Sequence, residues 1–323
     1  MRVRLRLPLV SNPEGGIALI IVLLVLSMLL ALVGEFALAM RLEATTTLNF
    51  RGAVAGAYLA EAAYHRAMAE IIPEAVAHHF DEDGRLVFRR DLLEVIEVPT
   101  REEIVLGPGR FAYRITDEEA RLNLNRATPQ IFGRLLAEVG VDQQTREVIV
   151  DSLLDWRDAN ELHRLKGAES DDYYLTLPVP YRSKNANLDS VDELLQVRGV
   201  TPEILYGRPD SPGLADYLTV AGSGAINVNT AEPTVLRALG FAEAEVEVLV
   251  AGRPYLNLAG LPTQFRRGNQ RTRSQTFRIE ARGELPGLGP RILVAVVQRK
   301  VGRDGLVGVT PLSWRWNPDE VRP

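Results

Sequence analysis

Residues 155 to 174, "DWRDANELHRLKGAESDDYY", hold the densest group of acidic side chains in the chain. Carboxylate and amide oxygens are hard ligands, and calcium takes about six to eight of them. Because the spacing does not match an EF-hand, a solvated acidic loop screened by Arg157, Arg164 and Lys166 is the competing interpretation. The candidate calcium ligands are Asp155, Asp158, Glu161, Glu169, Asp171 and Asp172, with Asn160 beside them.

The sequence contains no arrangement typical of a catalytic site. It has 0 Cys and 4 His, and His65, His78, His79 and His163 do not form a HExxH pair. Neither a GxSxG elbow nor a GxxxxGK loop is present. We therefore predict that the chain is not an enzyme. His78 and His79 follow the predicted end of a helix, so we expect them in an exposed loop.

A long apolar segment near the N-terminus, "NPEGGIALIIVLLVLSMLLALVGEFALAM", is long enough to cross a membrane. Every residue from Ile17 to Val33 is apolar or small, and the apolar character returns up to Met40. A spanning helix needs about 20 residues, whereas the apolar core of a secretion signal has about 7 to 15 and is cleaved on its far side. The leader before it carries Arg2, Arg4 and Arg6. The positive-inside rule therefore predicts a cytoplasmic N-terminus and an exported body.

The two glycines of this segment lie on the near side of the apolar run. A basic leader that ends in glycine on the cytoplasmic side of an apolar helix resembles the prepilin type of signal. The resemblance implies cleavage between Gly16 and Ile17, with Ile17 as the mature N-terminus. An uncut membrane anchor is the alternative.

The apolar helix is predicted to continue beyond the membrane. Apolar residues keep a spacing of three and four up to Pro73, which predicts one helix from about residue 17 to 72. We expect the strands that follow it to form one antiparallel sheet on which this helix packs, with the intervening helical stretch inserted between two of them. The segments with strand character are "GRLVFRRDLLEVIEV", "EEIVLGPGRFAYRIT", "QTFRIEARGEL", "PRILVAVVQRK" and "GVTPLSWRWN".

The helical stretch contains an internal repeat. "NLNRATPQIF" from Asn123 and "NVNTAEPTVL" from Asn227 share Asn, Asn, Ala and Pro at an offset of 104 positions. With the turn at Gly199 in "LLQVRGVTPE", the pattern predicts helix-hairpin-helix units. In DNA-binding modules of this kind, amides at the glycine approach a phosphate. Residues 119–271 carry 16 Arg and Lys against 21 Asp and Glu, so we expect a packing role and no nucleic-acid binding.

Several longer segments together match one known family. The chain resembles the minor pseudopilin K family of bacterial type II secretion systems, also called general secretion pathway protein K. The segment "ANELHRLK" departs from the family because it is more basic, with His163, Arg164 and Lys166 near the cation candidates. The matching segments are "DEEARLNLNRAT", "DWRDANEL", "GAESDDYYLTLPVPYRSKNANLDSVDELLQVRGV", "INVNTAEPTVL", "FRIEARGE" and "TPLSWRW".

The resemblance implies an α+β, pilin-like fold. A long N-terminal transmembrane helix packs on an antiparallel sheet, and an inserted all-α helix-hairpin-helix (SAM-like) domain holds calcium. The expected parts are a prepilin-type leader (1–16), the transmembrane part of the helix (17–40), the first part of the pilin-like domain (41–118), the inserted domain (119–271) and the second part of the pilin-like domain (272–323).

The resemblance also implies a location and partners. It implies a single-pass protein of the bacterial inner membrane with a periplasmic body, cleaved by prepilin peptidase and methylated. It implies a place at the pseudopilus tip with the minor pseudopilins I and J, where the outer-membrane secretin or secreted cargo could also bind. Most pilin-like subunits carry a glutamate at the fifth mature position, where this chain has Ile21. A subunit without that carboxylate has no amine above it to neutralise, which fits a tip.

Two functions of other classes stay open at this point. One is a membrane-anchored DNA receptor that uses the helix-hairpin-helix units, and the other is a receptor for secreted cargo.

Overall fold

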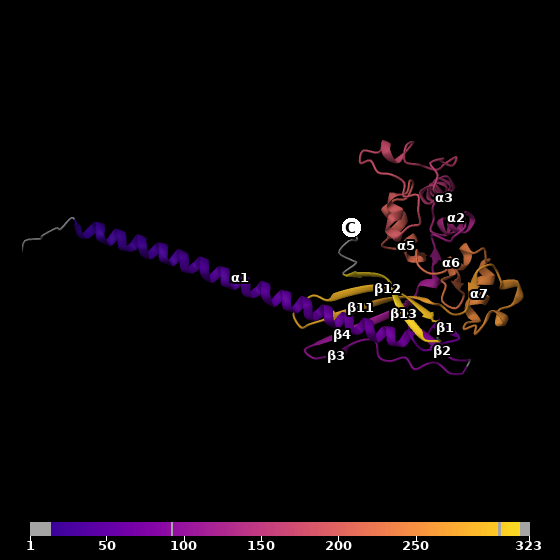
Figure 1. Ribbon diagram of the computed structural model, residues 1–323, viewed down its shortest axis with the longest axis horizontal. Helices are drawn as coiled ribbons and strands as arrows, with labels where there is room; N and C mark the ends of the chain where they lie inside the picture. The colour runs from indigo at the N-terminus through magenta and orange to yellow at the C-terminus, as the bar shows by residue number, and fades with distance from the viewer. Residues whose placement is uncertain (1–13, 92, 303–304, 317–323) are drawn as a thin grey trace, which may run out of the picture. The chain divides into compact units, whose positions relative to one another are not determined.

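The computed structural model describes residues 14–91, 93–302 and 305–316 and contains both helices and a sheet (Figure 1). Two compact units meet in sequence between Ala55 and Gly56. The first helix, α1 (Glu14–Ile71), contributes residues to both units. The leader positions Arg2, Arg4 and Arg6 lie outside the described residues.

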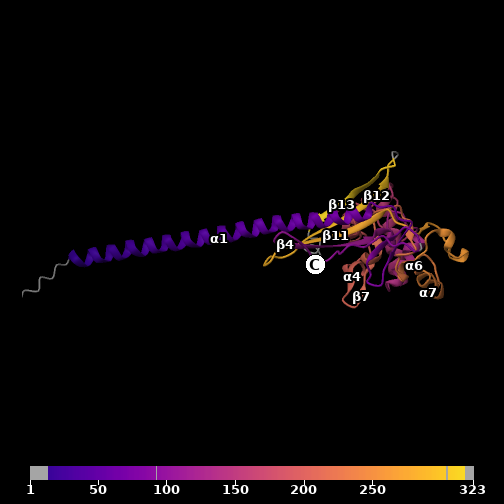
Figure 2. The same ribbon diagram turned by 90° about the horizontal axis from the view of Figure 1, so that it is seen from below.

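One antiparallel sheet of five strands forms the frame of the second unit (Figure 2). Its order confirms the prediction that early and late strands pair, because β4 lies next to β11 although the two are far apart in sequence. In register, Ile279 lies opposite Ile115 on one side and Ala295 on the other. The strands in sheet order are β13 (Val307–Trp316), β12 (Arg291–Val301), β11 (Thr276–Glu284), β4 (Gly109–Asp117) and β3 (Ile104–Leu106).

The C-terminal part of α1 packs on one face of this sheet. Its buried residues recur at helical spacing, and the alternate residues of each strand meet them, which is how a helix stripe and a pleated face form one core. Small side chains on the helix let the two backbones approach closely. The main members of this core are Leu59, Ala60, Ala63, Tyr64, Ala67, Ile71, Phe111, Tyr113, Ile115, Phe277, Ile279, Ala281, Leu293, Ala295 and Val297.

The contact between α1 and β11 is closest at a pair of glycines. A Cβ added at Gly283 would lie 2.2 Å from the carbonyl oxygen of Gly56, 2.6 Å from the amide nitrogen of Ala60 and 2.8 Å from Cβ of Leu59. The neighbours are mainly backbone atoms, which cannot move aside as a flexible side chain could. Glycine at position 283 is therefore required by the packing of the helix on the sheet.

A small hairpin follows α1 and corrects two expectations. β1 (Ala77–Phe80) pairs with β2 (Leu86–Arg89), apart from the main sheet. The expectation that the segment "GRLVFRRDLLEVIEV" joins the main sheet is therefore wrong, because its strand, β2, pairs with β1 in a separate two-stranded sheet. The prediction that His78 lies in an exposed loop is wrong, because His78 is buried in β1 and its Nδ1 accepts a hydrogen bond from the Ser274 amide at 2.8 Å. Burial lowers its pKa to about 3, and nearby Arg299 and Arg273 act in the same direction. The imidazole is therefore neutral and part of the core.

Between β4 and β11 the chain is helical and builds a second hydrophobic core. We call residues 118–275 the helical segment. Its α-helices are α2 (Pro129–Glu138), α3 (Gln143–Arg157), α4 (Pro202–Tyr206), α5 (Leu214–Tyr217), α6 (Pro233–Ala238) and α7 (Glu243–Ala251). The 3-10 turns are η1 (Glu118–Ala120), η2 (Tyr174–Thr176), η3 (Val191–Gln196), η4 (Leu258–Gly260) and η5 (Thr263–Phe265). Two-residue strands complete it: β5 (Leu122–Asn123), β6 (Gly207–Arg208), β7 (Ser211–Pro212), β8 (Leu218–Thr219), β9 (Ile226–Asn227) and β10 (Gln270–Arg271).

The internal repeat of the sequence has matching hydrogen bonds in the two copies. Asn123 and Asn227 each accept a hydrogen bond from the amide two residues on, at 2.9 and 3.0 Å. Asn125 and Asn229 each use their whole amide group to bond both backbone groups of a distant residue, Leu188 and Tyr255 respectively. An asparagine used in this way replaces a strand partner, which explains why two asparagines open each copy.

Three consecutive carboxylates are buried where the chain leaves the sheet. Asp117, at the end of β4, accepts hydrogen bonds at Oδ2 from Asn227 (2.8 Å), Thr230 (2.6 Å) and Ser274 (2.6 Å), and at Oδ1 from the Glu119 amide (2.8 Å). All of these donors are neutral, so burial raises the pKa of Asp117 although each hydrogen bond opposes the rise. The carboxylate of Asp117 therefore connects the start of the helical segment to its end at Ser274.

The next two carboxylates have arginine partners. Glu118 accepts from Arg278 at 2.5 Å and from Arg121 at 2.9 Å. Burial alone would raise its pKa, but these two cations outweigh burial and lower it. Glu119 has one cation, Arg271 at 2.8 Å. Burial, assisted by the charge of Asp117, raises the pKa of Glu119 to about 7.

The glycine contact predicts a large effect of one methyl group. We expect Gly283→Ala to lower the free energy of unfolding by about 1–3 kcal/mol, because the added Cβ overpacks the contact with α1. Gly289→Ala is the matched control, since nothing lies within 4 Å of a Cβ at that position. Thermal unfolding of the full-length protein in detergent compares the two. Equal melting temperatures for both variants would contradict the close contact.

The raised pKa of Glu119 predicts a pH dependence of stability. The folded state binds this proton up to a pH of about 7 and the unfolded state only up to about 4.5, so folding is favoured as the pH falls through this window. The window corresponds to at most about 3 kcal/mol. Relative to the wild type, Glu119→Gln should gain stability as the pH rises from 5 to 7, and the gain should level off towards pH 8. Chemical unfolding across that range measures the difference, and parallel curves would refute the assignment.

Candidate functional site

The acidic segment begins in the last turn of α3. Asp142 caps the first turn by accepting a hydrogen bond from the Thr145 amide at 3.1 Å. At the other end, Trp156 is buried with its ring edge-on to Tyr174, the centroids 5.2 Å apart, and its Nε1 donates to Glu193 at 3.0 Å. This packing fixes the orientation of the last turn, which also carries Asp155. Asp155 is completely buried.

Arg164 compensates the charge of the first two candidate ligands. Its amide donates to Oδ2 of Asp155 at 3.0 Å, and its Nη1 donates to Oδ1 of the same carboxylate. The same nitrogen donates to Oδ2 of Asp158 at 2.7 Å. The remaining oxygen of Asp158 accepts from the amide and side chain of Asn160, at 3.2 and 2.6 Å. All four oxygens of the Asp155–Asp158 pair therefore have donors.

Glu169 differs from Asp155 and Asp158, because one of its carboxylate oxygens has no hydrogen-bond donor. It is 1% exposed, and Oε2 accepts from the Ser183 hydroxyl at 2.8 Å. Oε1 is buried without a hydrogen-bond partner. Burial raises the pKa of this carboxyl; Ser183 opposes the rise, and the charges of Asp155, Glu161 and Asp158 add to it. A buried carboxylate with a free oxygen and acidic neighbours is a site that a cation would stabilise.

A second unsatisfied acceptor belongs to Asn185. Its Oδ1 is buried without a partner, while its Nδ2 donates to Oε1 of Glu161 at 2.9 Å. The position is fixed by the backbone, since the Asn185 amide donates to the Trp156 carbonyl at 2.9 Å. A side-chain amide oxygen is a ligand that calcium accepts. Asn185 was not a candidate in the sequence analysis, because no local spacing connects it to the acidic segment.

The remaining two predicted ligands are Asp171 and Asp172. Asp171 has an exposed side chain, and its nearest cation, Arg182, is 4.0 Å away. Asp172 accepts a hydrogen bond from the Glu169 amide at 3.0 Å, so it orients Glu169. Of the six predicted residues, Asp155, Asp158 and Glu161 lie close enough for their charges to act on Glu169.

The side chains of the acidic segment fit a calcium ion only in part. Within residues 14–91, 93–302 and 305–316, no group of three or more His, Cys, Asp or Glu side chains is arranged to hold a metal ion. The two buried acceptors, Glu169 Oε1 and Asn185 Oδ1, still lack donors, and both are hard oxygens. Glu161 is connected to one of them, because its Oε1 accepts a hydrogen bond from Asn185 Nδ2, and carboxylate and amide oxygens are ligands that calcium accepts together with water.

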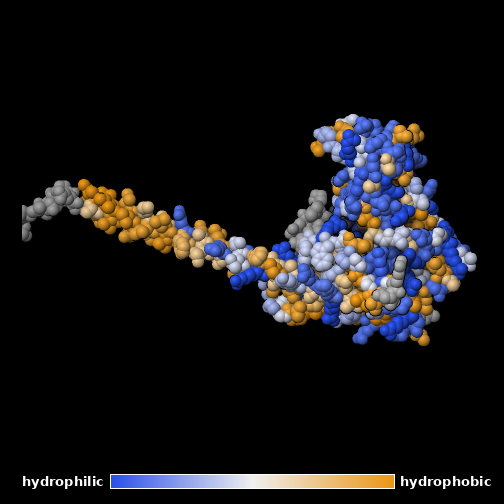
Figure 3. Space-filling model, in the orientation of Figure 1, coloured by the Kyte–Doolittle hydropathy of each residue, from blue (hydrophilic) through white to orange (hydrophobic). Residues whose placement is uncertain are grey.

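The apolar part of α1 is the second candidate site. In the described part of the chain, it belongs to the one helix that is long and apolar enough to cross a membrane. Hydrophobic residues cover this stretch of the helix in Figure 3. Both Ile17 and Ile21 lie within α1 and are exposed. Since only the lipid of a membrane or another helix can cover such a surface, it fits a single-pass anchor.

The hairpin at Gly199 is occupied by contacts within the protein. The Arg198 amide donates to the hydroxyl of Tyr174 at 3.3 Å, and the Val200 amide donates to the Val197 carbonyl at 3.2 Å. A Cβ at Gly199 would lie 2.9 Å from Cγ1 of Ile149, so the turn packs directly on α3. Two of the amides needed for a phosphate are therefore already bonded, and nothing here favours nucleic-acid binding.

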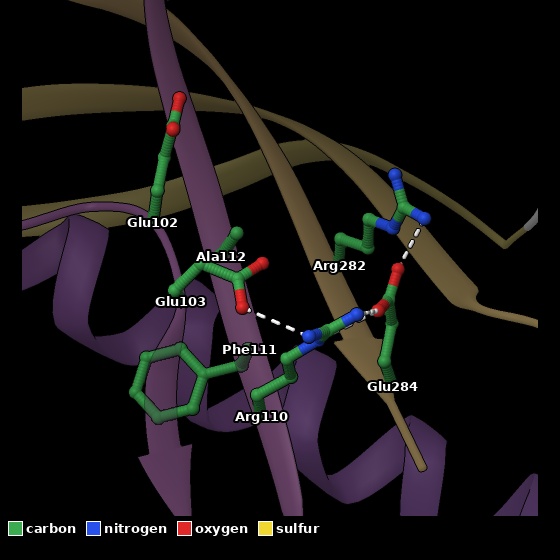
Figure 4. Close-up of a pocket in the computed structure, with 7 residues that line it drawn as sticks. All are labelled: Glu102, Glu103, Arg110, Phe111, Ala112, Arg282 and Glu284. Carbon is green, nitrogen blue, oxygen red and sulfur yellow. Dashed lines mark hydrogen bonds and ion pairs between the residues drawn. The ribbon is translucent and has the colours of Figure 1, made fainter. Parts of the chain in front are cut away.

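A cavity of about 300 Å³ on the sheet shows how other carboxylates differ from Glu169 (Figure 4). Arg110 lies between Glu103 and Glu284 and pairs with both at 2.9 and 2.8 Å. Glu284 also pairs with Arg282. None of these side chains has a buried oxygen without a hydrogen-bond partner, so the cavity differs in this respect from the surroundings of Glu169.

Comparisons with known proteins agree with this description. The family model of type II secretion system protein K matches residues 115–207, which include the acidic segment. Type II secretion system protein K of Pectobacterium carotovorum subsp. carotovorum is 33% identical over 45% of this chain and 44% of its own length. The protein of the same name from Aeromonas hydrophila is 28% identical over 68% of each chain.

A solved structure has the same fold. It is the GspK-GspI-GspJ complex from the type 2 secretion system of enterotoxigenic Escherichia coli. One of its chains matches with a TM-score of 0.63 and 17% identity, over 85% of this chain and 99% of that chain. The likeness therefore extends over the sheet as well as the helical segment. Together, the family model and the relatives show that the chain is similar in sequence to type II secretion system protein K over part of its length, and the solved structure shows a likeness in fold over most of it.

Proposed function

We propose that this chain is a minor pseudopilin of the type II secretion system and supports protein export across the outer membrane. The observation that carries the proposal is the fold match over 85% of the chain to a member of the GspK-GspI-GspJ complex. We infer that its partners are the minor pseudopilins I and J. Its role is structural rather than enzymatic, and its further contacts would be with the secretin or with cargo.

The helical segment, in this proposal, is an inserted domain of the helix-hairpin-helix (SAM-like) type within a pilin-like fold. Its two copies of the Asn-x-Asn unit and its separate hydrophobic core support this assignment. The proposed bounds are those expected from the sequence, 119–271, between 41–118 and 272–323. A domain of this size would obstruct another subunit from stacking on it, which suits a position at the tip.

The membrane segment supports the same position. Residues 17–40 would cross the bacterial inner membrane once, with the body in the periplasm and the leader, residues 1–16, removed by prepilin peptidase after Gly16. Ile21 places an apolar side chain where a carboxylate would need a neighbouring amine. A first subunit has no such neighbour, so the apolar residue costs nothing there.

We also propose that calcium binds beside α3. Glu161, Glu169 and Asn185 would hold it, because they supply the two buried acceptors without donors and the carboxylate next to them. Bound calcium would neutralise the carboxylates around Glu169 and fix the chain between residues 161 and 185. An exported protein can use a site of only millimolar affinity.

The proposed function predicts both processing and assembly. In a bacterium that lacks its own protein K, the full-length chain should restore secretion, begin at Ile17 and co-purify with pseudopilins I and J. Gly16→Leu should abolish processing, because a peptidase needs close backbone approach there. Gly34→Leu, deeper in the same helix, is the control for processing. Secretion by a chain that retains residues 1–16 would contradict the proposal, as would co-purification with neither pseudopilin.

Calcium binding predicts a shift in thermal stability. Full-length protein in detergent should melt several degrees higher in calcium at a hundredfold excess over Kd than in EDTA, since that excess contributes about 2.7 kcal/mol. Glu169→Gln should remove the shift, whereas Asp171→Asn, which changes an exposed carboxylate, should retain it. Superimposable wild-type curves would remove calcium from the proposal, and an undiminished shift in Glu169→Gln would place the ion elsewhere.

A further inference from the structure

Arg164 and the carboxylates it contacts form a closed unit at the end of α3. Asp155 is completely buried, and both of its oxygens accept from Arg164, one from the amide and one from the guanidinium. The guanidinium also reaches Asp158 at 2.7 Å. One arginine thus neutralises two carboxylates that are three residues apart on the same helix end.

The loop that carries Arg164 is shaped around the Asp155 carboxylate. A Cβ added at Gly167 would lie 1.8 Å from Oδ2 of Asp155, so only glycine permits this approach. The Gly167 amide donates to the Arg164 carbonyl at 3.0 Å, which closes the turn. The Lys166 amide donates to Asp151 at 3.1 Å. These contacts attach the loop to α3.

The unsatisfied acceptors of the acidic segment lie outside this unit. Every oxygen of Asp155 and Asp158 has a donor. Glu169 Oε1 and Asn185 Oδ1 are buried and have none. A calcium ion that took Asp155 or Asp158 as a ligand would have to displace the guanidinium and leave its positive charge beside the metal. An ion at Glu169 and Asn185 would displace nothing.

We propose that Arg164 is the resident cation of this chain: it holds Asp155 and Asp158, keeps residues 158–167 folded without calcium, and restricts the metal to Glu161, Glu169 and Asn185. The placement of the metal rests on the proposed function, whereas the role of Arg164 does not. In this arrangement Arg164 is a positioning residue that decides which carboxylates the ion can use. Two cations, one fixed and one exchangeable, share a single acidic cluster.

The role of Arg164 is tested by melting the full-length protein in detergent with EDTA. Arg164→Met should lower the melting temperature by about 5 °C or more, because it leaves the buried Asp155 charge without its partner. Lys166→Met is the matched control, since it removes a cation of the same loop whose pairing with Glu147 is exposed. It should change the melting temperature by about 1 °C or less. Equal effects of the two variants would overturn the proposal.

A second pair of variants keeps the test informative if Arg164→Met does not fold. The double variant Asp155→Asn with Arg164→Met removes the completely buried charge and leaves only that of Asp158, which is partly exposed, so it should melt above Arg164→Met or fold where that variant does not. Arg164→Lys keeps the charge but not the two-carboxylate geometry, so it should fall between the wild type and Arg164→Met. A double variant no better than Arg164→Met would refute the pairing.

The placement of the metal is tested by calorimetric titration of calcium into the same proteins. Asp158→Asn should bind calcium within about threefold of the wild-type Kd, whereas Glu169→Gln should weaken binding by about tenfold or more. The reverse order would overturn the proposed placement. If the wild type binds no calcium, the metal part of the proposal and of the function is wrong, while the melts in EDTA still decide the role of Arg164.

Discussion

A carboxylate that is removed from water must find donors or cations inside the protein, and this constraint shapes the molecule at two places. The first is the junction at Asp117, Glu118 and Glu119, which are at most 3% exposed. Their donors come from β11, from the second copy of the internal repeat and from Thr219 in β8, so the charges join the sheet to the helical segment. The sheet and the helical segment accordingly belong to one compact unit, and these three buried residues lie where they join.

The second place is the end of α3, where the same constraint has two solutions. Arg164 supplies a charge from within the chain to Asp155 and Asp158. Around Glu169 the chain supplies hydroxyl and amide groups but leaves two acceptors without donors. This contrast within one short segment distinguishes carboxylates that the fold has neutralised from those that can still recruit a cation from solution.

Much of the fold could be predicted because its signals are local. The alternation of Phe111, Tyr113 and Ile115 predicted a strand, and β4 has it. The spacing of apolar residues predicted α1 to within a few residues at each end. His78 was assigned wrongly because β1 has only four residues and exists through its pairing with β2 and its contact with Ser274. Such a strand has no periodicity to detect.

The sequence by itself determined the long apolar helix, the strands that pair in the main sheet, the internal repeat and the acidic character of residues 155–174. These properties depend on neighbouring residues in the chain, and they therefore appear in composition and spacing. Only the tertiary structure decided which carboxylates are free to bind a cation. Ser183 contacts Glu169 and Asn185 contacts Glu161 from a later part of the chain, and Arg164 folds back onto Asp155. Burial and donor count depend on such distant contacts, and spacing along the chain does not encode them.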